Sequence, residues 1–170
     1  MLEEYHAQFF TATINEWKPV LKDANNKDII IESLRFLVKE NRISLFAFVI
    51  MDDHLHIVWQ IKYPHQQENV QRDFLKFTAQ KIKFYLLDNH MEIVNELIVN
   101  HHDRKYMIWQ PDSLSIDLWT EVVFSQKVEY IQYNPVTARL SNLPEEYKYS
   151  SASFYELNQS EWEFITHYDE

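Results

Sequence analysis

The most restrictive feature of this sequence is that none of its 170 residues is glycine. The Walker phosphate loop and the dinucleotide-binding fingerprint both need glycine where the backbone approaches a phosphate. The sequence therefore excludes both of these nucleotide-binding motifs. Small barrels with many tight turns, including His-x-His enzymes of the cupin type, are disfavoured for a related reason, because tight turns commonly use the conformational freedom of glycine.

Length and composition indicate one folded domain that spans residues 1–170. Hydrophobic residues make up 46% of the chain and aromatic residues 15%, which argues against disorder. No cysteine is present, so a disulfide framework and a thiolate metal site are excluded. The sequence has no apolar run of membrane-spanning length and no signal-peptide pattern, and we therefore expect a cytoplasmic protein without a membrane partner.

Four segments have the composition of strands, with many aromatic, β-branched and other apolar residues. They are residues 7–14, 44–51, 54–61 and 106–110. The second of them is almost continuously apolar, which is typical of a central strand covered on both faces. The turn between the second and the third consists of Asp52 and Asp53.

Helical spacing of apolar residues predicts the remaining elements. Helices are expected over 26–41, 66–89 and 119–134, and a further helix followed by a polar loop over 91–105. The helix over 119–134 should end at Asn134, because the residue before a proline avoids helical geometry. Residues 143–157 are expected to be mostly loop and turn. This order of elements predicts an α+β domain in which helices pack on a central antiparallel sheet.

The segment FVIMDDHLHIVWQ, residues 48–60, places two histidines one residue apart on a predicted strand. Alternate side chains of a strand share a face, so His54 and His56 point the same way, about 6.7 Å apart along the strand. Two neutral imidazoles at this spacing can bind one metal ion. The pattern alone also fits two surface histidines on a half-exposed sheet. Asp53 is either a carboxylate that supports the pair or a plain turn residue.

A second informative segment is KVEYIQYNPV, residues 127–136. Helical spacing places Lys127, Tyr130 and Asn134 on one face, separate from the apolar stripe. That stripe consists of Phe124, Val128 and Ile131. A lysine, a phenol and a carboxamide together form a possible reaction surface. Taken alone, the segment favours a surface tyrosine and an asparagine that caps the helix before Pro135.

Taken together and in this order, DDHLHIVW, WQPDS, YIQYNPV and LPEEYKYSSAS resemble the single-tyrosine transposases of the His-hydrophobic-His (HUH) nuclease superfamily. The branch that the sequence resembles most is that of the REP-associated tyrosine transposases and their insertion-sequence relatives. The resemblance extends from about residue 5 to residue 155. Family members commonly have proline or asparagine in the turn before the histidines, where this chain has Asp52 and Asp53.

The resemblance implies a ferredoxin-like fold and a specific set of roles. It implies that His54 and His56 hold a divalent cation, Mg²⁺ or Mn²⁺, with Asn134 as the third ligand. Tyr130 corresponds to the nucleophile, which attacks a phosphate of single-stranded DNA and becomes joined to the 5′ end. The implied substrate is a DNA hairpin with a flanking single strand. Tyr133 is the less suitable nucleophile, because Tyr130 stands four residues before Asn134 and occupies the family position.

The chemistry of these residue types agrees with the implied roles. A phenol has an ordinary pKa of about 10 and is a weak nucleophile at neutral pH, so it needs assistance. A cation on a phosphoryl oxygen offsets developing charge. Two imidazoles and one amide oxygen leave coordination positions open, unlike a closed structural zinc site. A covalent phosphotyrosine keeps the energy of the phosphodiester bond, so strands can be rejoined without ATP.

DNA binding has to be reconciled with a net charge of −10. Positive charge is concentrated in the helix predicted over 66–89 and in two other places. The residues expected to contact DNA are Arg72, Lys76, Lys83, Arg104, Lys105 and Lys127. Tyr85, Tyr106 and Trp109 are candidates for stacking on unpaired bases. With so acidic a chain, affinity for DNA should be modest and strongly dependent on salt.

The sequence therefore predicts a metal-dependent tyrosine DNA endonuclease and strand transferase, that is, a transposase or a domesticated relative. One alternative is a hairpin-binding protein that has lost cleavage, which would bind without forming a covalent product. Another is a metal-dependent nuclease that uses water, whose cleavage would survive the Tyr130→Phe substitution. Insertion-sequence members of the family act as dimers, and a homodimer is expected weakly here.

Overall fold

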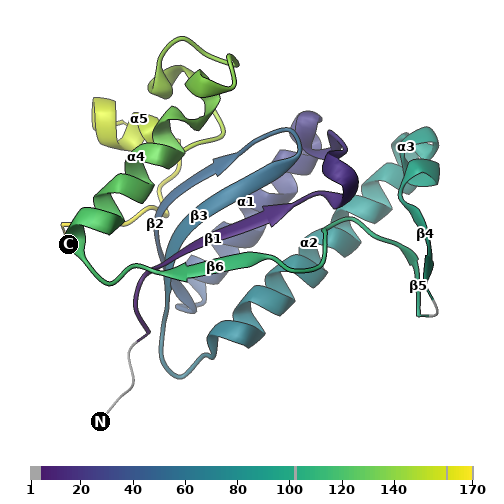
Figure 1. Cartoon of the computed structure of the whole chain (residues 1–170), viewed down its shortest axis with the longest axis horizontal. Coiled ribbons are helices and arrows are strands. Elements are labelled where there is room, and N and C mark those ends of the chain that lie inside the picture. Colours follow the sequence, from purple (N-terminus) through teal and green to yellow (C-terminus); the bar gives the residue numbers. More distant parts are fainter. Residues whose placement is uncertain (1–4, 102, 160, 170) are drawn as a thin grey trace.

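A four-stranded antiparallel sheet forms the centre of the computed structural model, which describes residues 5–101, 103–159 and 161–169. Its strands are β1 (Gln8–Thr13), β2 (Ile43–Ile50), β3 (His54–Ile61) and β6 (Leu114–Asp117). They lie in the order β2-β3-β1-β6, as Figure 1 shows. A long helix that packs on the sheet connects β1 to β2, and another lies between β3 and β6. This is the ferredoxin-like arrangement, and the predicted α+β fold is confirmed.

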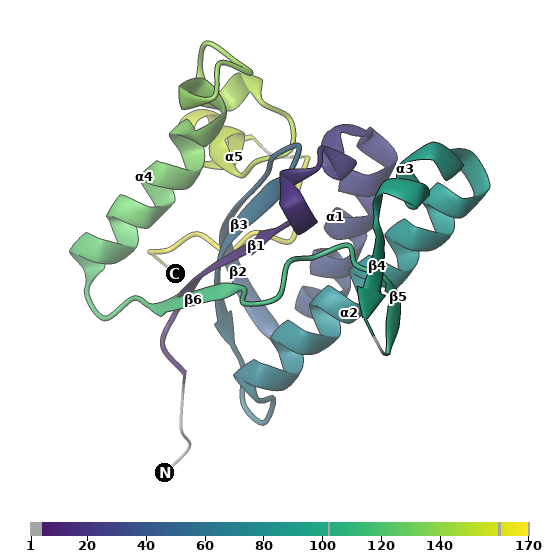
Figure 2. The same cartoon turned by 45° about the vertical axis from the view of Figure 1, so that its right-hand side comes forward.

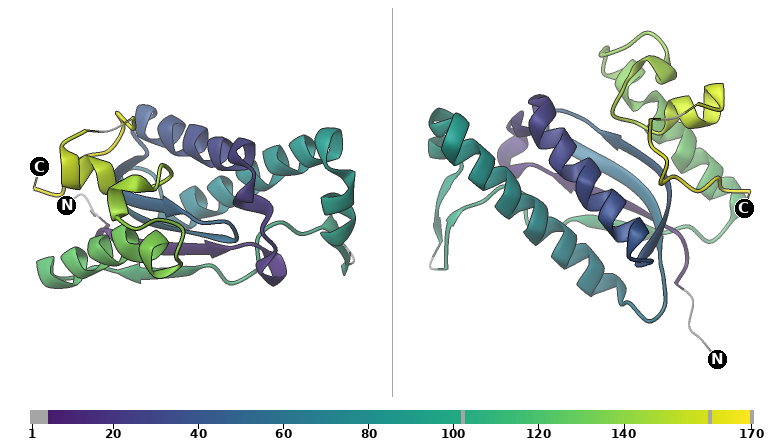
Figure 3. Two further views of the ribbon diagram at one scale, coloured as in Figure 1. Left: turned by 90° about the horizontal axis from the view of Figure 1, so that it is seen from above. Right: turned by 180° about the vertical axis from the view of Figure 1, so that it is seen from behind.

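Helices cover both faces of this sheet (Figure 3). On one face lie α1 (Ala24–Lys39) and α2 (Gln67–Asn89), and on the other lies α4 (Glu121–Thr137). Because side chains alternate along each strand, Phe10 and Trp59 enter the core under α1 and α2. Phe9 and Val58 enter a second, smaller core under α4. None of the described helices is both long and apolar enough to cross a membrane.

Strand β2 is buried on both faces, as predicted, but it is an edge strand and not a central one. Its outer edge is covered by residues from the end of the chain. The Ile50 N–H donates to the carbonyl of Tyr149 (2.9 Å), and the Thr166 N–H donates to the carbonyl of Leu45 (2.8 Å). Residues 143–157, expected as loop, contain a 3₁₀ turn (Pro144–Glu146) and helix α5 (Ala152–Leu157).

The segment between α2 and β6 differs most from prediction. A helix followed by a polar loop was expected over 91–105. The helix is the short α3 (Met91–Glu96), and a hairpin of β4 (Ile98–His101) and β5 (Arg104–Tyr106) takes the place of the loop. This unit projects beyond the sheet at the end of α2 (Figure 2). Instead of a strand over 106–110, Trp109 makes an isolated bridge to Ile14, and the fourth strand is β6.

Helix α4 does not end before its proline, contrary to prediction. Pro135 lies inside the helix, which continues to Thr137, and the Ala138 N–H still donates to the carbonyl of Asn134 (3.0 Å). A proline lacks the N–H that would bond to the carbonyl four residues earlier, here that of Ile131. Pro135 is buried on the side of α4 that packs on the sheet. Its apolar contact therefore offsets the missing hydrogen bond.

Two further 3₁₀ turns, Asn15–Trp17 and Val20–Lys22, connect β1 to α1.

Candidate functional site

The two histidines of β3 lie side by side on the sheet face that α4 covers. Their ring centroids are 4.9 Å apart. In the antiparallel register His56 is paired with Thr11 of β1, and His54 with Thr13. The predicted shared face is confirmed, since Leu55 and Ile57, which alternate with the histidines, belong to the opposite core.

Each histidine has a hydrogen-bond partner at Nδ1. His54 Nδ1 lies 2.6 Å from Asp53 Oδ1, and His56 Nδ1 lies 2.8 Å from Thr11 Oγ1. An ionised carboxylate only accepts hydrogen bonds, so Nδ1 of His54 is the protonated nitrogen and Nε2 carries the lone pair. Such a partner fixes the ring orientation of a metal-binding histidine and increases its basicity. Asp53 is thus more than a turn residue, because it orients His54.

His56 is the buried member of the pair, with 7% of its surface exposed. Burial, together with the smaller effects of the nearby His54 and Lys127, lowers the pKa of His56 from its ordinary 6.5 to about 3. His56 is therefore neutral at any ordinary pH. A neutral imidazole keeps the lone pair that metal binding needs.

The turn before the histidines is held by the surrounding structure without any glycine. The Leu21 N–H donates to the carbonyl of Asp52 (2.9 Å), and the Ile14 N–H donates to the carbonyl of Asp53 (2.8 Å). Lys27 Nζ of α1 lies 3.1 Å from Asp52 Oδ1, and the Lys27 side chain is only 7% exposed. Neither aspartate adopts a positive φ. The two aspartates therefore need no glycine, and Lys27 ties their turn to α1.

Helix α4 places Tyr130 above the histidine pair. The ring centroids of Tyr130 and His56 are 5.3 Å apart, and the two planes are tilted by 68°. The Tyr130 ring also meets the edge of Phe9 at 6.0 Å. Half of Tyr130 (50%) stays exposed, so a substrate can reach it. Val128 and Ile131 are buried against the sheet, and their burial fixes which side of α4 faces the histidines.

Lys127 completes this side of the site. Its ammonium nitrogen lies 4.7 Å from the centre of the Phe9 ring and 5.7 Å from that of Tyr130. A cation at this position is attracted by the faces of the two rings. It also brings positive charge next to the ring of Tyr130.

Asn134 follows Tyr130 by one helical turn and is partly buried. Among residues 5–101, 103–159 and 161–169, no three His, Asp or Glu side chains are grouped closely enough to hold a metal ion. A third protein ligand beside His54 and His56 would therefore be of another type. The amide oxygen of Asn134 is of a type that suits Mg²⁺ and Mn²⁺.

The other predicted DNA contacts lie away from this site. Arg72, Lys76 and Lys83 belong to α2, which packs on the opposite face of the sheet. Arg104 and Lys105 lie on the exposed β5 strand. The structure brings two of these residues together, since the Lys83 and Lys105 ammonium nitrogens lie 5.8 and 5.3 Å from the centre of the Tyr106 ring.

Two of the aromatic residues proposed to stack on bases have structural roles. Trp109 is buried, and its indole N–H donates to Thr78 Oγ1 (3.0 Å). The Tyr85 hydroxyl donates to Asp23 Oδ2 (2.8 Å), at the residue that caps α1. Trp109 is buried, so the prediction that it stacks on a base is wrong. Tyr85 is partly buried with its hydroxyl engaged, and its stacking on a base stays a prediction.

Sequence reasoning missed Thr11, Phe9 and Lys27 as parts of the site. Thr11 and Phe9 lie in an ordinary strand pattern, and only the register with β3 reveals that they face the histidines. Lys27 reads as a surface residue near the start of a helix. Its one sequence signal is a position one turn before the apolar residues Ile30 and Ile31.

No model of a known protein family matches this chain, and no curated protein matches it either. Solved structures do match this chain. A REP-associated tyrosine transposase, solved bound to a REP hairpin, is 17% identical with a TM-score of 0.65, covering 89% of this chain and 79% of that one. A candidate transposase from Deinococcus radiodurans is 18% identical with a TM-score of 0.48, covering 77% of this chain and 91% of that one.

The comparison establishes the architecture of this chain. Its sheet and helices have the fold of a REP-associated tyrosine transposase, as the sequence resemblance implied. At this level of identity the likeness speaks for the fold, and the function has to be argued from the site itself.

Proposed function

We propose that this protein is a transposase that cleaves and rejoins single-stranded DNA next to a hairpin, through a 5′-phosphotyrosine at Tyr130 and with the help of a divalent metal ion. The observation that carries the proposal is the 5.3 Å approach of the Tyr130 ring to the His56 ring. The phenol and the histidine pair come from different elements, α4 and β3. Packing alone would be served equally well by apolar residues at these positions.

His54, His56 and Asn134 are the residues that would hold the metal ion. The fit rests on the chemistry of the donors. Both imidazoles have Nδ1 engaged by a neighbouring oxygen, and burial keeps His56 neutral. When bound, Mg²⁺ or Mn²⁺ supplies a Lewis acid that withdraws charge from a phosphoryl oxygen and orients the phosphate.

In the proposed reaction the oxygen of Tyr130 attacks the phosphorus of a DNA phosphodiester. A bond forms between that oxygen and phosphorus while the bond from phosphorus to the 3′ oxygen breaks. The phenol gives up its proton, and the departing 3′ oxygen gains one to become a hydroxyl. Lys127 lies where its positive charge offsets negative charge on the phosphoryl group. Rejoining is the reverse reaction with another 3′ hydroxyl.

The proposed substrate is a DNA hairpin with a single-stranded flank. The structural relative was solved with a REP hairpin, and this chain shares its fold. The basic residues of α2 and β5 form a second set of candidate phosphate contacts on the other side of the sheet. A strand cleaved at Tyr130 could continue from there to the α2 side around the β6 edge. Homodimer formation and a cytoplasmic location stay predictions.

The proposal is tested by mixing the protein with labelled hairpin oligonucleotides from the DNA that flanks its own gene, with Mn²⁺ or Mg²⁺, on a denaturing gel. We expect a band that joins DNA to protein. The band should disappear with Tyr130→Phe, with His56→Ala and with a chelator. Tyr133→Phe is the matched control, since Tyr133 is an exposed tyrosine on the same helix, and it should leave the band intact.

Two other results would favour the alternative functions. Cleaved DNA without a joined band, persisting in Tyr130→Phe, would indicate a nuclease that uses water. Intact DNA that still shifts on a native gel would indicate a hairpin-binding protein. Either result overturns the proposed strand transfer.

A further inference from the structure

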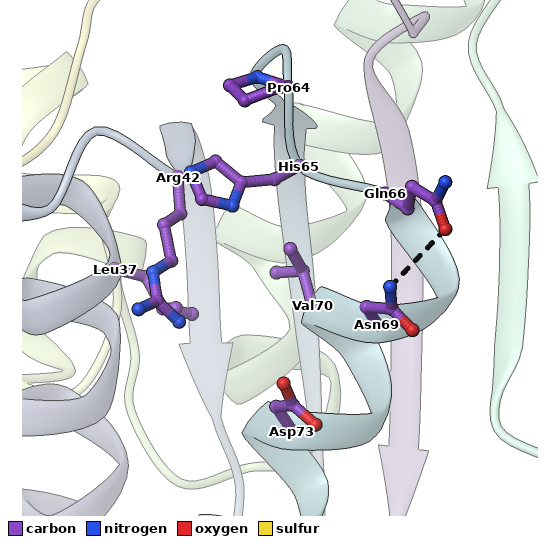
Figure 4. A pocket seen from close by; sticks show the side chains of 8 residues that line it. All are labelled: Leu37, Arg42, Pro64, His65, Gln66, Asn69, Val70 and Asp73. Carbon is purple, nitrogen blue, oxygen red and sulfur yellow. Dashed lines mark hydrogen bonds between the residues drawn. The ribbon is translucent and has the colours of Figure 1, made fainter.

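A cavity of about 340 Å³ lies between α1 and α2, at the end of the sheet opposite the histidine pair. Its floor is apolar and buried, made by Leu37 of α1 and Val70 of α2. Its rim is polar, with Arg42, His65 and Asp73 (Figure 4). Five of the eight lining residues are polar or charged, so the cavity suits a ligand that forms hydrogen bonds.

The rim of the cavity carries two side chains of opposite charge, Arg42 and Asp73. Figure 4 shows the Arg42 guanidinium on one side of the space and the Asp73 carboxylate on the other. The ion pair that Asp73 forms is with its neighbour Arg72 (3.0 Å). Arg42 rests 5.4 Å from the centre of the Phe36 ring. Asp73 accepts two hydrogen bonds from Arg72 at Oδ1, which leaves Oδ2 for a ligand.

We propose that this cavity binds one unpaired guanine base of the DNA. A guanidinium suits the O6 and N7 acceptors of guanine, and this pairing is the commonest specific contact to that base. A carboxylate suits the N1–H and N2–H donors on the neighbouring edge. Adenine, cytosine and thymine each lack at least one of these two edges. The apolar floor accommodates the flat faces of the ring system, and His65 lies beside the space as a stacking partner.

The surface around the cavity fits a base that belongs to a DNA strand. Asn69 and Asp73 line the cavity, and Arg72 and Lys76 follow at helical spacing on the adjoining exposed side of α2. A strand whose phosphates contact Arg72 and Lys76 would present its bases at the opening. The occupant is therefore expected to be part of a polynucleotide, and the free mononucleotide should bind the same groups more weakly.

This inference rests on the proposed function, since it concerns the same DNA. The cavity lies just beyond the C-terminal end of β3, whereas the histidines lie at the N-terminal end of that strand. The two sites are therefore separated by about 20 Å along the strand. A guanine held there takes no part in the chemistry. It would select which DNA is bound and set how the strand is positioned.

The test has two parts, both with the full chain. Saturation-transfer NMR with dGMP, dAMP, dCMP and dTMP reports on the cavity whether or not the protein cleaves DNA. Anisotropy with labelled hairpins then compares single-stranded flanks of alternating dT and dG with flanks that carry deoxyinosine or dA in place of dG. We expect signals from dGMP above the other three, and dG flanks that bind about tenfold more tightly than dA flanks.

Variants assign the effect to the cavity. Arg42→Ala should remove the preference for dG over dA, and Asp73→Asn the preference for dG over deoxyinosine, which lacks the 2-amino group. Lys39→Ala and Asp88→Asn, exposed residues on the same two helices, are matched controls and should keep both preferences. Equal binding of all flanks, or an equal loss for all flanks in Arg42→Ala, would overturn the proposal. A joined DNA band alongside equal binding would leave the proposed function standing.

Discussion

The two faces of the sheet differ in what they bury. Under α1 and α2 the sheet contributes large apolar side chains, among them Phe10 and Trp59. Under α4 the core is smaller, and it shares its face with two histidines and a half-exposed tyrosine. The difference suggests a division of labour in which one face provides most of the stability and the other can carry polar groups for chemistry.

The largest effect on stability is expected from Trp59→Ala, on the α1 and α2 face. Removing a fully buried tryptophan leaves a cavity and should cost about 3–5 kcal/mol of the free energy of unfolding, measured by urea denaturation. Tyr130→Ala, on the other face, removes a half-exposed ring and should cost less than about 1 kcal/mol. Equal losses would contradict the division of labour.

Trp59→Phe sharpens this test. The indole nitrogen of Trp59 is buried and has no hydrogen-bond partner among the described residues. Phenylalanine removes that unpaired donor while keeping most of the ring, so it should cost much less than alanine. A loss as large as that of Trp59→Ala would contradict the view that the unpaired N–H group costs stability.

A smaller effect is expected at the ion pair of Lys27 with Asp52, which ties the turn before the histidines to α1. Lys27 is almost fully buried, whereas a third of the Asp52 side chain is exposed. Asp52→Asn should therefore destabilise more, by about 2 kcal/mol, since it leaves a buried ammonium without its counter-charge. Lys27→Met leaves a carboxylate that water can reach and should cost about 1 kcal/mol. Chemical denaturation measures both, and the reverse order would contradict this view of the turn.

The last effect concerns the pH dependence of stability in metal-free protein, and it grows as the pH falls. The pKa of His56 is about 3 in the folded state, below its ordinary value of 6.5, so the unfolded chain binds an extra proton between these two values. His56 therefore costs no stability above pH 6.5 and destabilises the fold as pH falls toward 3, by up to about 1.4 kcal/mol per pH unit. His56→Gln should show a flatter decline between pH 6 and 4 in urea titrations with EDTA. Parallel curves for the two proteins would show that His56 is not desolvated.

Much of the fold follows from local patterns in the sequence. The alternation of side chains along the strand predicted that His54 and His56 share a face. The helical spacing of apolar residues predicted α1, α2 and α4 to within a few residues of their bounds. The helix end was predicted wrongly at Pro135, where burial outweighs one missing hydrogen bond. Strand β6 was missed because four residues between loops give too short a pattern.

The composition of the site could be predicted only in part. Tyr130 and the histidines were linked through a resemblance, since nothing local in the sequence places α4 over β3. Thr11 and Lys27 depend on the pairing register and on burial, which are properties of the folded chain. The basic residues of α2 were expected to serve the same DNA, but a sequence does not reveal which layer of the sheet a helix joins.

The covered edge of β2 has a consequence for how the chain is made. Synthesis proceeds from the N-terminus, so the hairpin of β2 and β3 leaves the ribosome well before residues 149–166, which later cover its open side. During that interval the hairpin exposes a row of unpaired backbone groups. Neighbouring nascent chains on one messenger RNA carry the same open edge and could pair with it. Translation speed across this stretch, and chaperones that bind there, would then affect the yield of folded protein.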